Sequence, residues 1–318
     1  MEQTIEKSEI DLKGLDFLTL LDYSPQQIKH LLEVAIDLKA KQKQGEQTPM
    51  LQGKSLGMIF ENASTRTRVS FEVGMTQLGG HALFLSPRDL QIGRGEPIKD
   101  TANVLARYVD AIMIRTNSHE TVEEFAQYSS VPVINALTDL YHPCQAMADL
   151  LTVLEHKGKL AGLKLVYVGD GNNVAHSLLA AGAKVGMDVV VSTPKGYEVD
   201  PVIFAKVQDA ANETGATISL CTDPKEAVKD ADVIYTDVWA SMGFEAEQHE
   251  REQALKAYQV NEELVQHAKQ DFLFLHCLPA HRGEEVSDTI IDGGHSVIYD
   301  QAENRLHAQK AILASLIR

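Results

Sequence analysis

Cysteine and basic residues are both scarce in this chain. Its 318 residues include three cysteines, Cys144, Cys221 and Cys277, an odd number that does not make a disulfide framework. Lys and Arg total 29 against 45 Asp and Glu, which gives a formal net charge of -16. Because a chain this acidic repels phosphate backbones, nucleic acid is not an expected partner. Any anionic substrate must therefore be held by a local concentration of arginines.

Long apolar runs are also missing. None approaches the ~18–20 residues needed to cross a bilayer, and the first ten residues, MEQTIEKSEI, lack the basic and apolar parts of a secretory signal. We therefore expect a cytoplasmic protein with no membrane partner. Hydrophobic residues make up 44% and charged residues 23%, ordinary proportions for a globular protein. At roughly 150 residues per domain, the length predicts two domains.

Short β-type runs alternate with amphipathic segments along the chain. Strands are predicted at 55–60, 81–85, 111–115, 131–135, 163–169, 188–192, 217–221, 233–236, 272–276 and 296–300. Helices are predicted at 24–44, 65–78, 98–107, 118–128, 142–159, 174–185, 201–214 and 303–316. This alternation is typical of parallel sheets covered by helices on both faces. The sequence therefore predicts two α/β domains of similar size with doubly wound parallel sheets and a boundary near 158–162.

Hydroxyl groups and arginines gather at one predicted helix start, the segment ENASTRTR at 61–68. A helix N-terminus presents unpaired N–H groups and the positive end of the dipole, which suits an oxyanion. The hydroxyls of Ser64, Thr65 and Thr67 and the guanidinium of Arg66 would complete a phosphate site. The alternative is a well-capped helix whose arginines face solvent. The Walker pattern GxxxxGK[ST] is absent.

A second motif, Tyr-His-Pro-Cys-Gln at 141–145, begins the long 142–159 helix. Pro143 suits the first helical turn, and His142 and Gln145 can share one helical face. Arg115 closes a predicted strand at the same edge of the sheet. Because ligands of open α/β sheets bind beyond the carboxyl ends of the strands, we expect these side chains to face a ligand.

Three segments of the second half also follow predicted strands. In Gly-Asp-Gly-Asn-Asn at 169–173, Val174 occupies the third position of a dinucleotide fingerprint, which argues against a nicotinamide cofactor. Its asparagines either bind a zwitterionic ligand or form an Asx turn. Asp-Val-Trp-Ala-Ser-Met-Gly at 237–243 combines a carboxylate with a segment that could form a lid. The third segment is His-Cys-Leu-Pro at 276–279, at the end of the strand predicted at 272–276.

Together these motifs resemble the aspartate/ornithine carbamoyltransferase family, and within it the ornithine-specific members. The family's carbamoyl-phosphate motif Ser-Thr-Arg-Thr stands at 64–67, and its His-Pro-Cys-Gln motif at 142–145. The ornithine-type motifs stand at 170–173, 237–243 and 276–279. Aspartate-specific members typically carry His-Pro-Leu-Pro at the last position, and putrescine-specific members lack the Ser-Met-Gly loop. The resemblance covers nearly the whole chain.

The resemblance implies two substrates, carbamoyl phosphate and L-ornithine. The residues implied for carbamoyl phosphate are Ser64, Thr65, Arg66, Thr67, Gln91, Arg115, His142, Pro143, Cys144, Gln145, Cys277, Leu278 and Arg305. Those implied for ornithine are Asn173, Asp237, Ser241 and Met242. Gln91 matches a family position that reaches into the neighbouring subunit of a homotrimer.

The implied reaction is attack of the δ-amine of ornithine on the carbonyl carbon of carbamoyl phosphate. Arg115 and His142 would stabilise the oxyanion, and Arg66 the leaving phosphate. Asp237 and Cys277 would position the α-amino group, with Cys277 a candidate proton acceptor or else a buried small residue. The implied reaction needs no metal or other cofactor.

The implied domain boundaries are 1–150 with 304–318 for carbamoyl phosphate and 151–303 for ornithine. A long helix would join them, and the C-terminal helix would return to the first domain. Two functions from other classes are alternatives to a carbamoyltransferase. A dinucleotide-dependent dehydrogenase would leave the 64–68 motif unexplained, and a non-catalytic amino-acid-binding protein usually carries a secretory signal.

Overall fold

Two parallel sheets form the framework of the protein. The computed structural model describes residues 10–86, 88, 90–92, 95–240 and 247–318. The first sheet has the order β2-β1-β3-β4 and the second the order β7-β6-β5-β8-β9. Their strands are β1 (Ser55–Phe60), β2 (His81–Leu85), β3 (Ala111–Arg115), β4 (Val133–Leu137), β5 (Lys164–Val168), β6 (Asp188–Ser192), β7 (Ile218–Cys221), β8 (Val233–Thr236) and β9 (Leu273–His276). Every neighbouring pair is parallel.

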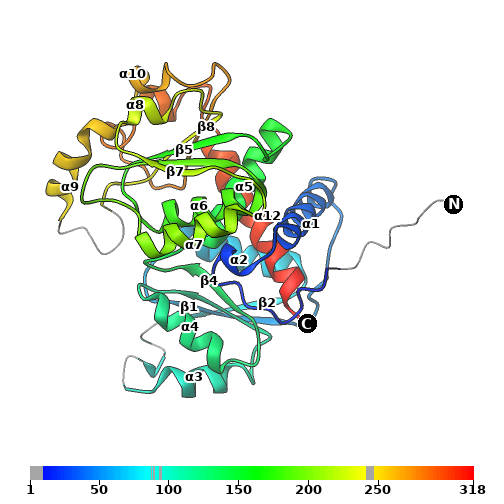
Figure 1. The fold of residues 1–318 in the computed structure, drawn as a ribbon. Coiled ribbons are helices and arrows are strands. Elements are labelled where there is room, and N and C mark those ends of the chain that lie inside the picture. The colour runs from blue at the N-terminus through cyan, green and yellow to red at the C-terminus, as the bar shows by residue number, and fades with distance from the viewer. Residues whose placement is uncertain (1–9, 87, 89, 93–94, 241–246) are drawn as a thin grey trace.

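Helices connect the strands and cover the sheets (Figure 1). The main ones are α1 (Pro25–Lys43), α2 (Thr65–Gln77), α3 (Ile98–Leu105), α4 (His119–Tyr128), α5 (Pro143–Lys157), α6 (Asn173–Val185), α7 (Pro201–Ala211), α9 (Gln248–Leu255) and α12 (Ile298–Leu316). Shorter elements are η1 (Leu20–Asp22), α8 (Pro224–Ala227), η4 (Lys256–Tyr258), α10 (Glu262–Val265) and α11 (Asp288–Ile291). Ser24 starts α1 with a full capping box to Gln27, which satisfies two donors at the helix start.

Each sheet has one point where the strand order reverses. In the first sheet β1 lies between β2 and β3, and in the second β5 lies between β6 and β8. The chain leaves β1 and β5 in one direction along the sheet and later returns to pair on their other side. Ligands of open α/β sheets bind at such switch points, beyond the carboxyl ends of the strands.

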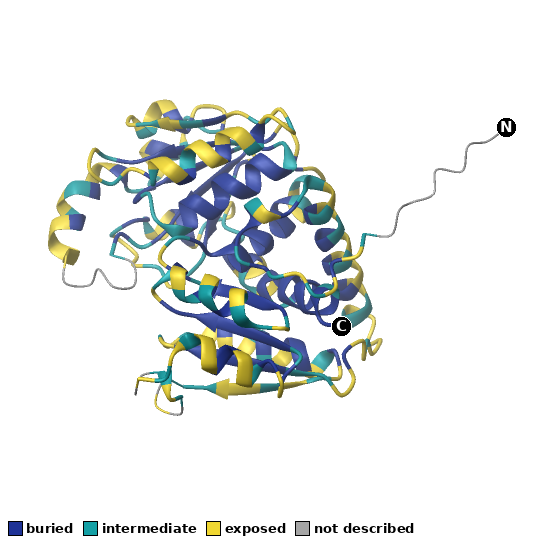
Figure 2. Ribbon diagram, turned by 60° about the horizontal axis from the view of Figure 1, so that its bottom comes forward, coloured by how far each residue is buried: buried dark blue, intermediate teal, exposed yellow. Residues whose placement is uncertain are grey.

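The C-terminal helix α12 returns to the first domain. It packs against α5, α1 and α2 and also touches β9 of the second sheet. Figure 1 shows it, in red, passing alongside α5 between the two sheets. The interior that results is continuous, and Figure 2 shows the buried residues concentrated along the strands and central helices. Within the described residues, no helix combines the length and apolar character of a membrane span.

The predicted fold class is confirmed, and one predicted strand is wrong. Residues 296–300 were expected to form a strand, but Ile298 begins α12, and Ser296 contributes an isolated bridge to Phe274. The first-sheet strand expected at 131–135 runs two residues later, at Val133–Leu137. Pro132 lacks an N–H group and contributes to the sheet through its carbonyl, which accepts from Ile112. The domain boundaries at 150, 151, 303 and 304 remain a prediction.

Candidate active site

The N-terminus of α2 forms one wall of a polar site. Ser64, in an extended conformation after β1, caps the helix through its hydroxyl, which accepts from the N–H of Thr67. The hydroxyl of Ser64 also donates to Thr67 Oγ1 at 3.0 Å. Thr67 is buried, whereas Arg66 is exposed and extends across to the loop after β9, where Nη2 donates to the carbonyl of Leu278 at 2.7 Å. The cap therefore orders the first turn and leaves its hydroxyls at the site.

Three guanidinium groups converge on this wall. Arg115 ends β3, next to β1 in the sheet, and Arg305 comes from α12. Arg305 donates from Nη1 to Gln145 Oε1 at 2.8 Å and from Nη2 to Thr67 Oγ1 at 3.0 Å. Burial, followed by repulsion from Arg305 and Arg66, lowers the pKa of Arg115 to about 10. This cluster is the local concentration of positive charge that an anionic ligand requires in an acidic protein.

His142 and Gln145 lie at the start of α5, next to the arginine cluster. Burial, followed by repulsion from Arg305, Arg115 and Arg66, holds the pKa of His142 well below its ordinary value. The imidazole is therefore neutral near pH 7. Its Nδ1 is buried and has no hydrogen-bond partner in the described part of the chain. The backbone N–H of His142 donates to Ser177 Oγ on α6 at 2.7 Å, which ties this residue to the second domain.

A cavity of about 780 Å³ joins these residues to the carboxyl ends of the second sheet. Its lining from the first half includes Ser64, Thr65, Arg66, Thr67, Arg115, His142 and Gln145. Its lining from the second half includes Asp170, Gly171, Asn172, Asn173, Asp237, Arg251, Cys277, Leu278 and Arg305. Both switch points therefore open into one space of a size that suits small molecules.

The wall opposite the arginines is acidic and amide-rich. Asp237 follows β8 and is 6% exposed. Its carboxylate accepts from Asn172 Nδ2 at 3.0 Å and from the thiol of Cys277 at 3.0 Å. Asn172 also caps α6, and Asn173 donates from Nδ2 to the carbonyl of Thr138 in the first domain at 2.5 Å. The cavity is thus polarised, with Arg66, Arg115 and Arg305 on one side, and Asp237 and the Arg251–Asp170 ion pair on the other.

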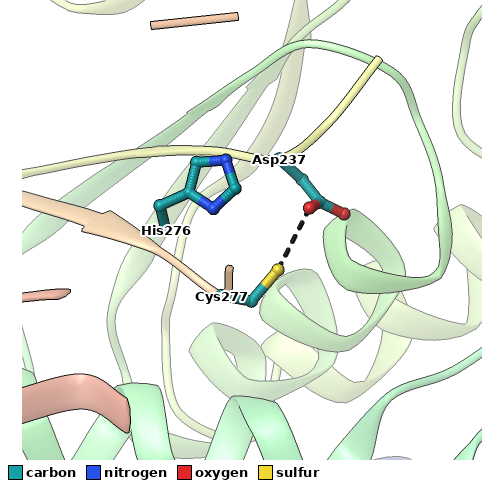
Figure 3. Close-up of side chains that lie close together, drawn as sticks. All are labelled: Asp237, His276 and Cys277. Carbon is teal, nitrogen blue, oxygen red and sulfur yellow. Dashed lines mark hydrogen bonds between the residues drawn. The ribbon is translucent and has the colours of Figure 1, made fainter. Parts of the chain in front are cut away.

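The loop after β9 is held by a buried histidine. His276 Nδ1 accepts from the N–H of Leu278 at 2.9 Å, so Nε2 carries the proton and donates to Glu285 Oε1 at 3.0 Å. This bond shapes a turn in which Leu278 has a φ of 59°, a rare conformation for this residue type. Figure 3 shows that the thiol of Cys277 points toward Asp237, with the imidazole of His276 beside them.

Asp237, His276 and Cys277 also have ligand atoms within 4.8 Å of one another, a spacing that could hold a metal ion. Both ring nitrogens of His276 are already engaged, so the imidazole could bind a metal only by giving up one of its hydrogen bonds. His281, Glu284 and Glu285 form a second such group. Since Glu285 is the partner of His276, that group too is part of the loop's internal bonding.

Comparisons with known proteins identify the family of the chain. The family model described as "Aspartate/ornithine carbamoyltransferase, carbamoyl-P binding domain" matches residues 15–155, and that described as "Aspartate/ornithine carbamoyltransferase, Asp/Orn binding domain" matches residues 161–316. The chain belongs to the aspartate/ornithine carbamoyltransferase family.

Individual carbamoyltransferases of this family are similar along their whole length. The chain is 71% identical to an ornithine carbamoyltransferase of Halalkalibacterium halodurans over 98% of both chains. It is 60% identical to one of Pyrococcus abyssi over 97% of both. The solved ornithine carbamoyltransferase of Pyrococcus furiosus superposes with a TM-score of 0.94 at 58% identity, covering 97% of this chain and 98% of that one.

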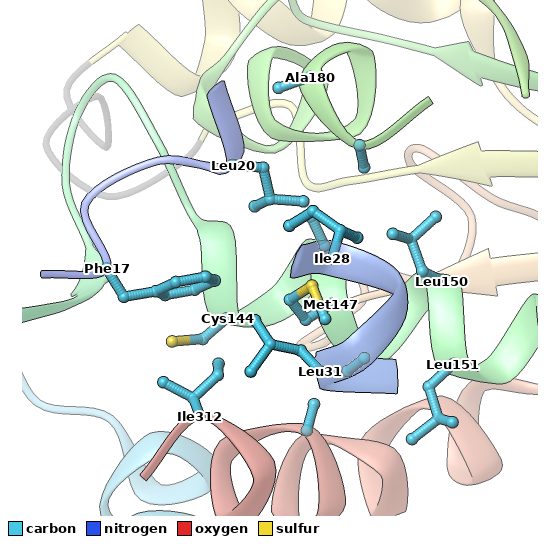
Figure 4. Packing of buried hydrophobic residues seen from close by; sticks show 14 of the residues in the cluster. Phe17, Leu20, Ile28, Leu31, Cys144, Met147, Leu150, Leu151, Ala180 and Ile312 are labelled. Atoms are coloured by element: carbon cyan, nitrogen blue, oxygen red, sulfur yellow. The ribbon is translucent and has the colours of Figure 1, made fainter. Parts of the chain in front are cut away.

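Most residues expected from the carbamoyltransferase motifs line the cavity, and three lie elsewhere. Cys144 is fully buried; its thiol donates to the carbonyl of Asn135, and Figure 4 shows it among Phe17, Met147 and other apolar side chains. Burial raises the pKa of Cys144 to about 12. Pro143 and Gln91 are not among the described residues that line the cavity, and Gln91 is exposed. Ser241 and Met242 lie outside the described residues.

Sequence reasoning missed Arg251 and its partner Asp170, which also line the cavity. Arg251 Nη1 donates to Asp170 Oδ2 at 2.6 Å, and both side chains are buried. The helix that carries Arg251, α9, was not predicted, because its sequence QHEREQAL has little apolar periodicity. Asn172 was expected either to bind a zwitterionic ligand or to form an Asx turn, and in the structure it caps α6 and contacts Asp237.

Proposed function

We propose that this protein is an ornithine carbamoyltransferase, which transfers the carbamoyl group of carbamoyl phosphate to the δ-amine of L-ornithine and releases L-citrulline and phosphate. The observation that carries the proposal is the polarised cavity of this carbamoyltransferase-family chain. Arg66, Arg115 and Arg305 surround one end, and Asp237 lies at the other. A dianionic phosphate and an α-ammonium group have complementary charges at these two ends.

Carbamoyl phosphate binds with its phosphate at the N-terminus of α2. The hydroxyls of Ser64, Thr65 and Thr67, the helix N–H groups and Arg66 hold the phosphate oxygens. Arg305, which contacts both Thr67 and Gln145, holds the carbamoyl end with Gln145. Arg115 and His142 then face the carbonyl oxygen, where negative charge develops during attack.

Ornithine binds against the second domain. Asp237 holds the α-ammonium group, with Asn173 and the residues Ser241 and Met242 completing the binding site. The δ-amine must lose its proton before it can attack, because an alkylammonium has no lone pair. An amine like that of lysine has a pKa of about 10.4 in water, and burial beside three guanidinium groups lowers it.

The reaction is a substitution at the carbonyl carbon. The δ-nitrogen forms a bond to that carbon, and the bond from the carbon to the bridging oxygen breaks, so the electron pair leaves with phosphate. The phosphate oxygens take up the amine proton, and no protein base is demanded. Cys277 positions the α-amino group and Asp237: burial, followed by the negative charge of Asp237, raises the pKa of the thiol well above its ordinary value, so it stays protonated.

We further propose that the active enzyme is a cytoplasmic homotrimer that serves arginine biosynthesis. Gln91 supports the assembly, because it is exposed and lies among residues 90–92, apart from the cavity of its own chain. A related ornithine carbamoyltransferase of Pyrococcus furiosus, 59% identical over 96% of this chain, carries the designation anabolic.

Citrulline formation tests the function. The purified protein should form a carbamoylated product from carbamoyl phosphate and ornithine, and much less with putrescine, aspartate or N-acetylornithine. Only ornithine offers both a free α-ammonium group for Asp237 and a δ-amine at the right distance. Faster turnover of putrescine than of ornithine would assign the chain to the other specificity.

A further inference from the structure

Asp149 is a buried carboxyl group to which the mechanism above gives no role. It lies on α5, one helical turn after Gln145, and is 1% exposed. Its Oδ1 accepts hydrogen bonds from Gln145 Nε2 at 2.8 Å and from Gln301 Nε2 at 2.7 Å. Burial raises the pKa of Asp149 to about 7, although these two amides act in the opposite direction. A buried carboxyl group of this kind is costly and calls for a reason.

The carboxyl group decides which way the amide of Gln145 faces. Because Nε2 is directed at Asp149, Oε1 is the atom that accepts from Arg305 Nη1 at 2.8 Å. A flipped amide would place its NH₂ group against the guanidinium and its oxygen against the carboxyl oxygen. Both contacts would then be repulsive, so an acceptor at position 149 selects the observed orientation.

Arg305 connects this chain of bonds to the phosphate end of the cavity. Its Nη2 donates to Thr67 Oγ1, in the first turn of α2. Its Nε is buried and makes no hydrogen bond to any described residue. With Nη1 fixed by Gln145 and Nη2 fixed by Thr67, the plane of the guanidinium is set, and a planar group binds an oxyanion well in one orientation only.

We propose that Asp149 is a positioning residue, which acts through the amide of Gln145 to hold the guanidinium of Arg305 in the orientation that binds carbamoyl phosphate. Gln301 steadies the carboxyl group from α12 and also donates to the hydroxyl of Tyr235 at 3.1 Å. The inference rests on the proposed function for its substrate. Its core claim, that an acceptor at 149 orients an arginine of the carbamoyl phosphate site, can be measured separately.

Three variants of the full-length protein make the test. Asp149→Ala removes the acceptor, and Asp149→Asn keeps an oxygen in the same place. Thr152→Val is the matched control, because Thr152 is also fully buried on α5 and bonds Asn304, yet does not line the cavity. If Asp149→Ala does not fold, Asp149→Ser, too short to reach both amides, replaces it. The readouts are kcat/KM for carbamoyl phosphate and calorimetric binding of carbamoyl phosphate in the absence of ornithine.

Asp149→Ala should lower both kcat/KM and the affinity for carbamoyl phosphate by about tenfold or more, as misplacement of a binding group does. Asp149→Asn should stay within about threefold of the wild type, and Thr152→Val within about twofold. In a Gln145→Ala background, Asp149→Ala should have little further effect on carbamoyl phosphate binding, since the link is already broken.

Three results would overturn the inference: Asp149→Asn as impaired as Asp149→Ala, Asp149→Ala no worse than Thr152→Val, or an undiminished effect in the Gln145→Ala background. A wild-type protein that binds carbamoyl phosphate but forms no citrulline would contradict the proposed function instead, and the binding measurement would still decide the role of Asp149.

Discussion

Arg66 is the exposed member of the arginine cluster, and its described hydrogen bond is the one to the carbonyl of Leu278. Arg66→Ala should therefore leave folding intact while kcat/KM for carbamoyl phosphate falls by about 10²- to 10³-fold, the usual cost of losing a donor to developing charge. Arg68→Ala is the control, because Arg68 lies on the same helix but pairs with Glu72 and stacks on Phe84. Equal kcat/KM values for the two variants would show that Arg66 does not bind the phosphate.

Asp237 should select the amino acid rather than carbamoyl phosphate. Asp237→Asn keeps the size of the side chain and removes the charge that faces an α-ammonium group. The KM for ornithine should rise by about 10- to 100-fold, in line with a hydrogen bond to a charged group, while the KM for carbamoyl phosphate changes little. Steady-state kinetics with each substrate varied in turn measures both, and an equal rise in the two constants would refute the assignment.

Asp149 should make folding stability depend on pH. Its native pKa of about 7 lies above the ordinary value of 3.8, so the native state binds the proton more tightly than the unfolded chain. The unfolding free energy is therefore highest at acid pH and falls as pH rises toward 7, by about 2 kcal/mol between pH 5 and pH 8. Urea unfolding of the wild type against Asp149→Asn should show this loss in the wild type alone. Parallel curves would mean that the carboxyl group does not titrate in that range.

At the scale of elements, the turn between β5 and α6 depends on a glycine. A Cβ on Gly171 would overlap the backbone of residues 197–199, with the carbonyl oxygen of Tyr197 at 2.7 Å. Gly171→Ala should shift the turn that aims Asn172 at Asp237, and lower kcat/KM for ornithine by about 10- to 100-fold. Gly294→Ala is the control, since a Cβ there meets nothing within 4 Å. Equal activity of the two variants would show that the site does not depend on the close approach of Gly171 to residues 197–199.

The sequence predicted the strands and the carboxyl-end motifs better than the tertiary contacts that complete the site. Hydrophobic runs such as 55–60 and 111–115 form the buried strands of a parallel sheet. The residues that follow such strands all lie at the carboxyl edge of that sheet. Residues 296–300 have a β-type sequence, but α12 begins there because Gln301, Asn304 and Arg305 bury polar groups against α5. Arg251 gave no local signal, since its role comes from a partner 81 residues away. Asp149 gave none because Arg305, which it positions through Gln145, comes from α12 at the end of the chain.

At the scale of the whole molecule, the proposed trimer makes each active site a joint structure. Arg115→Ala disables a chain's own cavity, and Gln91→Ala disables the contribution it makes to a neighbour. Each variant alone should be inactive, and trimers mixed by subunit exchange should regain part of the activity, because some interfaces then pair an intact cavity with an intact Gln91. The recovered activity is measured by citrulline assays, after mass spectrometry has verified that the subunits have exchanged. No recovery in mixed trimers would refute the shared site.

The place of α12 in the chain order has a consequence for synthesis on the ribosome. Every described strand is made before this helix, yet α1, α2 and α5 bury their apolar faces against it. The first sheet can form while the second is still being translated, but its helices stay partly uncovered until α12 emerges. Over that interval the nascent protein exposes apolar surface, which makes it prone to aggregate. Arg305 arrives with the same helix, so a nascent chain cannot draw on the cell's carbamoyl phosphate before its fold is closed.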